Sequence, residues 1–176
     1  MHDVAQRLAQ RLFDRPLIQN SFRGAFVEEL IAPYMSKGGW RHCGDDWGSW
    51  DFEHPSGSRL ELKQSAAVQS WSNDDAKIET SPSFNISAKS GYWAGKDWFD
   101  APGRHANIYL FAWHGERSLK SADHRTIDQW EFFALNAGDL PRQRSIKLGA
   151  LRALGAVSTS ADHLLHVVER LRVAAE

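Results

Sequence analysis

The feature that most constrains the fold is an uninterrupted apolar run at 107–113, Asn-Ile-Tyr-Leu-Phe-Ala-Trp. A strand with one side in solvent alternates apolar and polar residues, and this run shows no such alternation. Continuous apolar strands are typical of the centre of a sheet that is covered on both faces. A second strand is predicted at 129–135, Gln-Trp-Glu-Phe-Phe-Ala-Leu. The fold is therefore expected to be built around a buried sheet.

Amphipathic helices are predicted around these strands, because apolar residues recur elsewhere at helical spacing. Pro16 is expected to end the first helix, and Asn20 or Ser21 to cap the second. A further short helix is expected within 145–154. The three main helical segments are 4–13, Asn20 or Ser21 to about Pro33, and 162–173. Together these elements predict a central mixed β-sheet flanked by helices, an α/β or α+β domain.

A short hairpin is predicted upstream of the buried strand. Its arms are 47–53 and 59–63, and Pro55-Ser56-Gly57 joins them. A three-residue turn of this kind needs one residue with positive φ, which Gly57 can supply. Symmetric folding about Ser56 then fixes which residue of one arm faces which residue of the other.

This register brings two acids and one lysine together. It sets Asp51 opposite Glu61. Side chains alternate along a strand, so Glu61 and Lys63 project to one face while Leu60 and Leu62 project to the other. Two carboxylates directly opposite each other are unfavourable. A sequence that keeps such a pair, with a lysine beside it, suggests a site for a divalent cation.

An Asp, a spacer and then Glu-x-Lys resembles the active-site motif of the PD-(D/E)xK, or restriction-endonuclease-like, nucleases. Here the motif is Asp51 with 61–63, and Trp50 stands where the family often has a proline. A short helix is predicted at 65–71. The resulting order of helix, hairpin, helix and strand over roughly 21–135 is similar to the family's core. The resemblance implies a restriction-endonuclease-like core in a single domain, 1–176.

The resemblance also implies roles for these residues. Asp51 and Glu61 would bind Mg²⁺, with Mn²⁺ as a substitute, and Leu62 would add its backbone carbonyl. Mg²⁺ takes oxygen ligands in octahedral geometry at about 2.0–2.1 Å. Lys63 would orient the attacking water or stabilise the transition state. Glu28, on the preceding helix, would complete the acidic cluster and bind metal. The alternative is a solvated charged face on an edge hairpin.

Three further residues are candidates or competitors. Glu29 competes with Glu28, since neighbours lie about 100° apart around a helix and only one can face the site. In the family, a glutamine often follows the motif lysine on the next helix, where it supports the metal-bound water or contacts the nucleic-acid backbone. Gln64 is the catalytic candidate and Gln69 the nucleic-acid candidate. Each could instead be an ordinary surface glutamine.

The segment 72–104 is polar and irregular, with a short strand expected at 84–87. A long segment before a core strand is expected to be a functional loop or an insertion. Aromatic and basic residues are interleaved in or next to it, which suits nucleic-acid binding by stacking and phosphate contact. These residues are Trp71, Trp93, Trp98, Phe99, Lys89, Lys96 and Arg104. The alternative is that the aromatic rings fold back onto the core.

Composition narrows the remaining classes. The chain has 176 residues, 42% of them hydrophobic, which suits one globular domain. A net charge of −1 excludes only a uniformly basic protein. The single cysteine, Cys43, cannot form an internal disulfide, and no leader or membrane span is recognised, so a cytoplasmic location is expected. The eight histidines lack zinc-site spacing, and no Gly-x-Ser-x-Gly or phosphate loop is present.

The expected function is hydrolysis of phosphodiester bonds, with DNA as the expected substrate, in restriction, repair or mobile-element defence. The alternative is a non-catalytic nucleic-acid-binding or complex-assembly module with the same fold. Since no separate target-recognition domain is apparent, specificity is expected to come from a homodimer or a larger complex.

Overall fold

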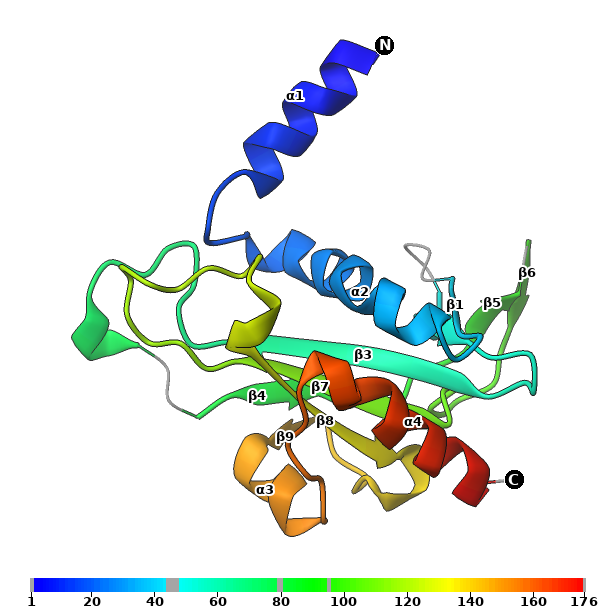
Figure 1. Cartoon of the computed structure of the whole chain (residues 1–176). Helices are drawn as coiled ribbons and strands as arrows, with labels where there is room; N and C mark the ends of the chain where they lie inside the picture. Colours follow the sequence, from blue (N-terminus) through cyan, green and yellow to red (C-terminus); the bar gives the residue numbers. More distant parts are fainter. Residues whose placement is uncertain (1, 44–47, 79–80, 95, 176) are drawn as a thin grey trace.

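A five-stranded mixed sheet forms the centre of the computed structural model, which describes residues 2–43, 48–78, 81–94 and 96–175. The strand order is β1-β2-β3-β7-β8, and only β3 and β7 run parallel (Figure 1). The predicted mixed sheet flanked by helices is therefore confirmed. The strands are β1 (Arg41–His42), β2 (Phe52–Glu53), β3 (Arg59–Ala66), β7 (Ile108–His114) and β8 (Trp130–Asn136).

The predicted central strand is β7, and all seven of its residues are buried. On one face of the sheet, Leu60, Leu62 and Leu110 pack against α2 (Asn20–Ser36) and α4 (Ala161–Ala175). The buried positions of α2 recur every four residues, which makes one continuous stripe facing the sheet. The predicted same-face placement of the two leucines is thus confirmed.

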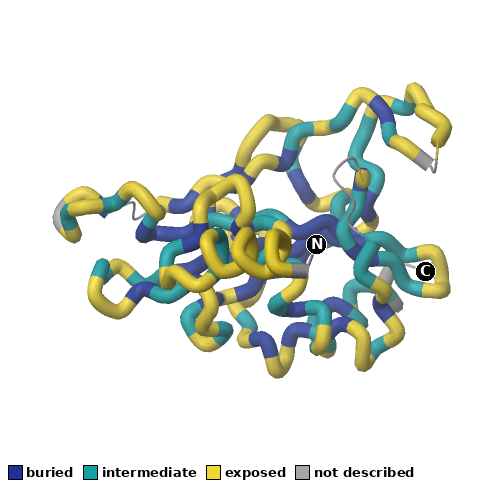
Figure 2. The backbone as a smooth tube through the Cα atoms, turned by 90° about the horizontal axis from the view of Figure 1, so that it is seen from above, coloured by how far each residue is buried: buried dark blue, intermediate teal, exposed yellow. Residues whose placement is uncertain are grey.

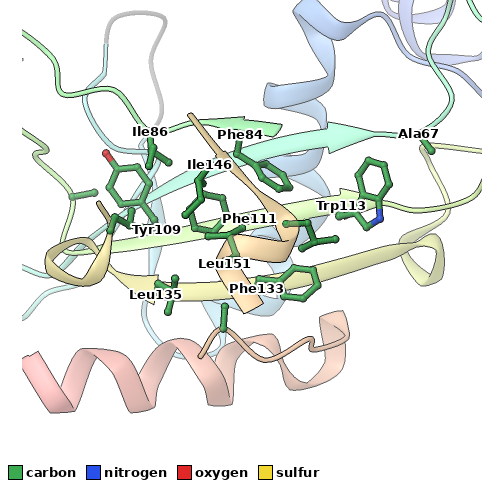
Figure 3. Close-up of a cluster of buried hydrophobic side chains, with 14 of the residues drawn as sticks. Ala67, Phe84, Ile86, Tyr109, Phe111, Trp113, Phe133, Leu135, Ile146 and Leu151 are labelled. Carbon is green, nitrogen blue, oxygen red and sulfur yellow. The ribbon is translucent and has the colours of Figure 1, made fainter. Parts of the chain in front are cut away.

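The opposite face is covered by a small two-stranded sheet and a short helix. Phe84 and Ile146 point into the same cluster as Phe111 and Phe133 (Figure 3). The rings of Phe84 and Phe111 meet edge-on, with centroids 5.2 Å apart. Coverage on both faces explains why the central strand is apolar throughout. The covering elements are β4 (Ser83–Asn85), β9 (Ser145–Lys147) and α3 (Leu148–Ala153).

Two elements project from this body. The helix α1 (His2–Phe13) points away from the sheet (Figure 1) and is exposed over nearly its whole length (Figure 2). Its last turn is anchored to the body, where Phe13 stacks on Phe26 with ring centroids 5.6 Å apart. The second element is the hairpin of β5 (Tyr92–Ala94) and β6 (Asp97–Phe99).

Several local predictions are wrong. The helix expected at 65–71 does not form, because Ser65 and Ala66 continue β3 and pair with Trp113 and His114 of β7. The segment from there to β7 contains one 3₁₀ turn (Asp75–Lys77) and the short strands β4, β5 and β6, and no α-helix among its described residues.

The second helix also differs at both ends. Its N-cap is Gln19, which makes no side-chain capping bond, and it continues through Pro33 to Ser36. The first hairpin arm is shorter than expected, and the pairing strand β1 was not predicted. Within the described ranges, no helix combines the length and apolar character needed to cross a membrane.

Candidate active site

The hairpin has the predicted register. Phe52 pairs with Leu60, which centres the fold on Ser56, and Gly57 has φ of +90° as the turn requires. The strand β2 begins at Phe52, so Asp51 lies just before the ladder. Its side chain is therefore not held above or below the sheet by strand pairing, and it can reach the backbone of β3.

Asp51 makes two hydrogen bonds to the backbone of β3. Its Oδ2 accepts a hydrogen bond of 2.6 Å from the backbone N–H of Leu62, and its own N–H donates to the carbonyl of Leu60 at 2.8 Å. The carboxylate thus takes the place of the backbone acceptor that β2 no longer provides. The N–H and C=O of one strand residue project to the same edge, so the Leu62 carbonyl is directed to this edge as well.

Glu61 is a buried carboxylate paired with two ammonium groups. It is 3% exposed. Lys63 donates to its Oε1, which confirms that these two side chains share a face. Lys89 reaches the same carboxylate, with Nζ 3.3 Å from Oε1 and 3.4 Å from Oε2. Lys89, a candidate for nucleic-acid binding, thus lies beside Glu61. Burial of a carboxylate requires such pairing.

The acids of the site repel one another. The pKa of Asp51 is raised to about 7, first by burial and then by the charges of Glu61 and Glu28. The Leu62 N–H and the Lys63 ammonium act in the opposite direction. Three carboxylates, from α2, β3 and the segment just before β2, therefore share one electrostatic environment, which raises the proton affinity of Asp51.

Of the two neighbouring glutamates on α2, Glu28 is the inner one. Its side chain is 14% exposed, against 73% for Glu29. Glu28 Oε2 lies 3.0 Å from His42 Nε2, and Glu29 Oε1 lies 3.4 Å from His42 Nδ1. The choice of Glu28 over Glu29 agrees with this burial. The imidazole partner on β1 was missed, and nothing in the local spacing marks it.

The two glutamines belong to a different network. The guanidinium of Arg23, which is 1% exposed, donates to Gln64 Oε1 at 2.6 Å and to Gln69 Oε1 at 3.0 Å. A third bond of 2.8 Å goes to Asn20 Oδ1. Burial lowers the pKa of Arg23 to about 10.

The structure corrects the expected position of both glutamines on a helix. Gln64 lies on β3, one position after Lys63, so it projects to the opposite face of the sheet from Glu61. Gln69 lies in the loop after β3, where its amide also donates to the carbonyl of Ala66 at 2.6 Å. Neither glutamine lies on a helix, and both are occupied in holding a buried cation.

The remaining aromatic candidates fall into two places. Trp93 and Trp98 sit on the β5–β6 hairpin with ring centroids 5.5 Å apart, and both are exposed. This hairpin approaches the site, since Tyr92 packs 6.0 Å from Trp50, the neighbour of Asp51. Trp71 is 68% exposed in the loop after β3. Lys96 is exposed in the turn of the hairpin.

The donor chemistry of the site fits a hard cation. Carboxylates that raise one another's proton affinity, beside a backbone carbonyl, supply the oxygen ligands that Mg²⁺ prefers. As the side chains are placed, no three His, Cys, Asp or Glu groups of the described chain converge on one point. Glu61 is instead turned to its two lysines, and Glu28 to His42. Joint binding of a metal ion by these carboxylates therefore requires their side chains to reorient.

Comparison of the chain with family models, with curated proteins and with solved structures finds no match.

Proposed function

We propose that the chain is a Mg²⁺-dependent nuclease of the PD-(D/E)xK type that hydrolyses phosphodiester bonds in DNA. One observation carries the proposal: the Asp51 carboxylate is bound to the Leu62 N–H, next to a Glu61 carboxylate that shares its face with Lys63. The Asp51 carboxylate at the edge of β3 thus lies within electrostatic reach of Glu61 and Lys63 on one face of the same strand.

Asp51, Glu61 and the Leu62 carbonyl would hold Mg²⁺ or Mn²⁺, and Glu28 would complete the acidic group. The ion, when bound, supplies a water of lowered pKa and neutralises charge on the phosphate. The mutual repulsion that raises the Asp51 pKa favours such an ion, because a cation relieves it.

The protein's own groups would contribute charge and a proton site. Lys63 places an ammonium beside Glu61, where it would stabilise charge that develops on the phosphoryl oxygens. Lys89 adds a second ammonium to the same place. Asp51 can exchange a proton near neutral pH, since its pKa is about 7.

A restriction-endonuclease-like core is part of the proposal. The β1-β2-β3 meander, the parallel strand β7 and the helix α2 across one face support it. The absence of an α-helix from the described residues between β3 and β7 is a departure from the expected element order. A cytoplasmic role in restriction, repair or mobile-element defence, with a homodimer or larger complex supplying specificity, remains part of the same proposal.

Cleavage of plasmid and single-stranded DNA in Mg²⁺ or Mn²⁺ tests the activity. The native chain should cut, EDTA should stop it, and Asp51→Asn and Lys63→Ala should each lower the rate by at least about a hundredfold, as loss of one electrostatic contact typically does. Asp139→Asn, the same chemical change at an exposed position away from the site, is the matched control. Native and Asp51→Asn samples that cut equally would refute the assignment.

A second candidate is a binding module with the same fold and no catalysis. The observation that favours it is the pairing of Glu61 with two lysines, which satisfies the carboxylate without an ion. A titration of melting temperature with Mg²⁺ and Mn²⁺ separates the two. A rise that Glu61→Gln abolishes supports the nuclease, and the absence of any rise favours the module.

A further inference from the structure

A surface hollow of about 1330 Å³ lies on the outer side of the small β4–β9 sheet. Strand alternation explains its chemistry. Phe84 and Ile86 turn into the core, so the residues between and beside them turn outward. The outward residues of β4 and the residues just after it are Ser83, Asn85 and Ser87. On β9, Ser145 also lines the hollow, while Ile146 is buried.

The hollow is strongly positive. Arg104, Arg142 and Arg144 line it, and none of the described residues in its lining is acidic. Its lining thus carries three formal positive charges in a chain whose net charge is −1. A concentrated charge of one sign in a concave surface attracts ligands of the opposite sign.

These three cations have no carboxylate partner among the described residues. Arg104 is half-buried, and its guanidinium donates to backbone carbonyls, including those of Ile86 and Leu140 at 3.0 Å each. It therefore fixes the wall of the hollow while its charge stays uncompensated. Arg142 and Arg144 are exposed, and the described structure assigns their side chains no ion pair.

The uncharged residues that line the hollow also suit contact with phosphate groups. Serine, asparagine and glutamine side chains stand between the arginines, and these are the residue types that contact nucleic-acid phosphates together with arginine. Gly103 and Gly138 keep part of the surface free of side chains.

The backbone of the chain links the hollow to the acidic centre. Ser87 lines it, and Lys89, two residues further on, contacts Glu61. The backbone of Lys89 is tied to Gly103, a lining residue, by a reciprocal pair of bonds of 2.8 and 2.9 Å. Two extended residues span roughly 7 Å, the axial rise of about two base-pair steps of B-form DNA.

We propose that this hollow binds the phosphodiester backbone of the nucleic-acid strand on one side of the acidic centre. The inference rests on the proposed nuclease function and gives that site a direction: the strand leaves Glu61 past Lys89 and runs over the outer face of β4 and β9. Arg142 and Arg144 contact phosphates, and Arg104 supplies fixed charge from the wall.

The test is DNA binding without cleavage. A fluorescent 20-base-pair duplex is titrated in EDTA at several salt concentrations with the native chain and with Arg142→Ala/Arg144→Ala. Two lost phosphate contacts should reduce the slope of log affinity against log salt by about 1.8 and lower affinity at 0.15 M salt about thirtyfold. The matched control is Arg15→Ala/Arg170→Ala, which removes two exposed charges elsewhere and should change affinity by less than about threefold.

Melting curves must show that both variants fold like the native chain, as expected for exposed arginines. Equal affinity and slope for the native chain and Arg142→Ala/Arg144→Ala would overturn the inference, and Mg²⁺-dependent cleavage would still stand as a separate result. The reverse result, a reduced slope with no cleavage by the native chain, would support the hollow as a nucleic-acid site and refute the nuclease.

A second experiment tests whether the hollow binds a polynucleotide or a small free anion. Inorganic phosphate is titrated against the melting temperature of the native chain and the double variant. Stabilisation by phosphate that requires Arg142 and Arg144, together with unchanged DNA binding, would assign the hollow to a small anion and overturn the inference.

Discussion

The ammonium of Lys89 lies 3.3 Å from the carboxylate of Glu61, although 28 residues separate them in the chain. With Lys63 on the same oxygen, Glu61 is held by two cations. Any divalent ion that binds Glu61 has to compete with these two cations for the carboxylate oxygens. The pairing therefore sets the affinity of the site for metal as well as the stability of the metal-free chain.

Removal of Lys89 is expected to strengthen metal binding. Lys89→Ala leaves one ammonium fewer in competition for Glu61, and its ammonium is about one-third exposed, so the gain should be modest, up to about fivefold in Mg²⁺ affinity. The measurement is the Mg²⁺ midpoint of the rise in melting temperature. Lys96→Ala removes an exposed lysine of the same segment and should leave that midpoint unchanged. A weaker Mg²⁺ midpoint for Lys89→Ala would contradict the competition.

The proton on Asp51 makes stability depend on pH. Its pKa is about 7 in the folded chain and 3.8 in the reference state, so the folded chain binds more protons between these values. The free energy of unfolding should therefore fall as pH rises from about 4 to about 7, by at most about 1.4 kcal/mol per pH unit for one proton.

Asp51→Asn removes this proton. In EDTA the variant should lack that part of the decline and should gain stability relative to the native chain as pH rises towards 8. Urea unfolding at pH 4.5, 6 and 7.5 measures it, with Asp139→Asn as the control for the same substitution on the surface. Parallel pH profiles for the native chain and Asp51→Asn would show that Asp51 has an ordinary pKa.

The elements that could be predicted are those whose burial leaves a local pattern. The strand β7 is buried at every position, so its sequence carries no polar alternation. The hairpin register followed from the symmetry of a short turn closed by Gly57. The helix expected after Lys63 failed because Ser65 and Ala66 complete the ladder with β7, and this long-range pairing overrides local preference.

The site was predictable to the same extent. Glu61 and Lys63 are two residues apart, so strand geometry alone places them together. Lys89 lies in a loop whose backbone pairs with Gly103, and this pairing places it beside Glu61. A long-range contact of this kind leaves no periodic pattern in the sequence. Arg23 did leave a signal, since it continues the four-residue spacing of Val27 and Ile31 and therefore had to face the core.

Gln64 and Gln69 should prove structural. Alanine at either position removes an acceptor from the buried Arg23 guanidinium, and an unsatisfied buried polar group costs about 1–3 kcal/mol. Each variant should therefore unfold at a lower urea concentration than the native chain. Below the unfolding transition, the rate of DNA cleavage should stay within about twofold of the native rate. A group that does not contact the reacting atoms leaves the activation barrier of the reaction unchanged. Gln143→Ala, an exposed glutamine with only a local backbone contact, is the stability control. A large loss of cleavage rate in folded Gln64→Ala would restore its catalytic role.

The exposed tryptophans Trp93 and Trp71 should differ in how much they contribute to DNA binding. The β5–β6 hairpin and the loop that follows β3 lie at opposite ends of the sheet (Figure 1), and only the hairpin packs next to Trp50. Stacking of one base on an aromatic ring contributes about 1–3 kcal/mol, so Trp93→Ala should weaken single-stranded DNA binding at least about fivefold. Trp71→Ala is the matched control, because it removes an equally large exposed ring far from the acidic centre, and its affinity should equal that of the native chain. Fluorescence anisotropy in EDTA measures both, and equal losses for the two variants would mean that the hairpin has no special part in binding.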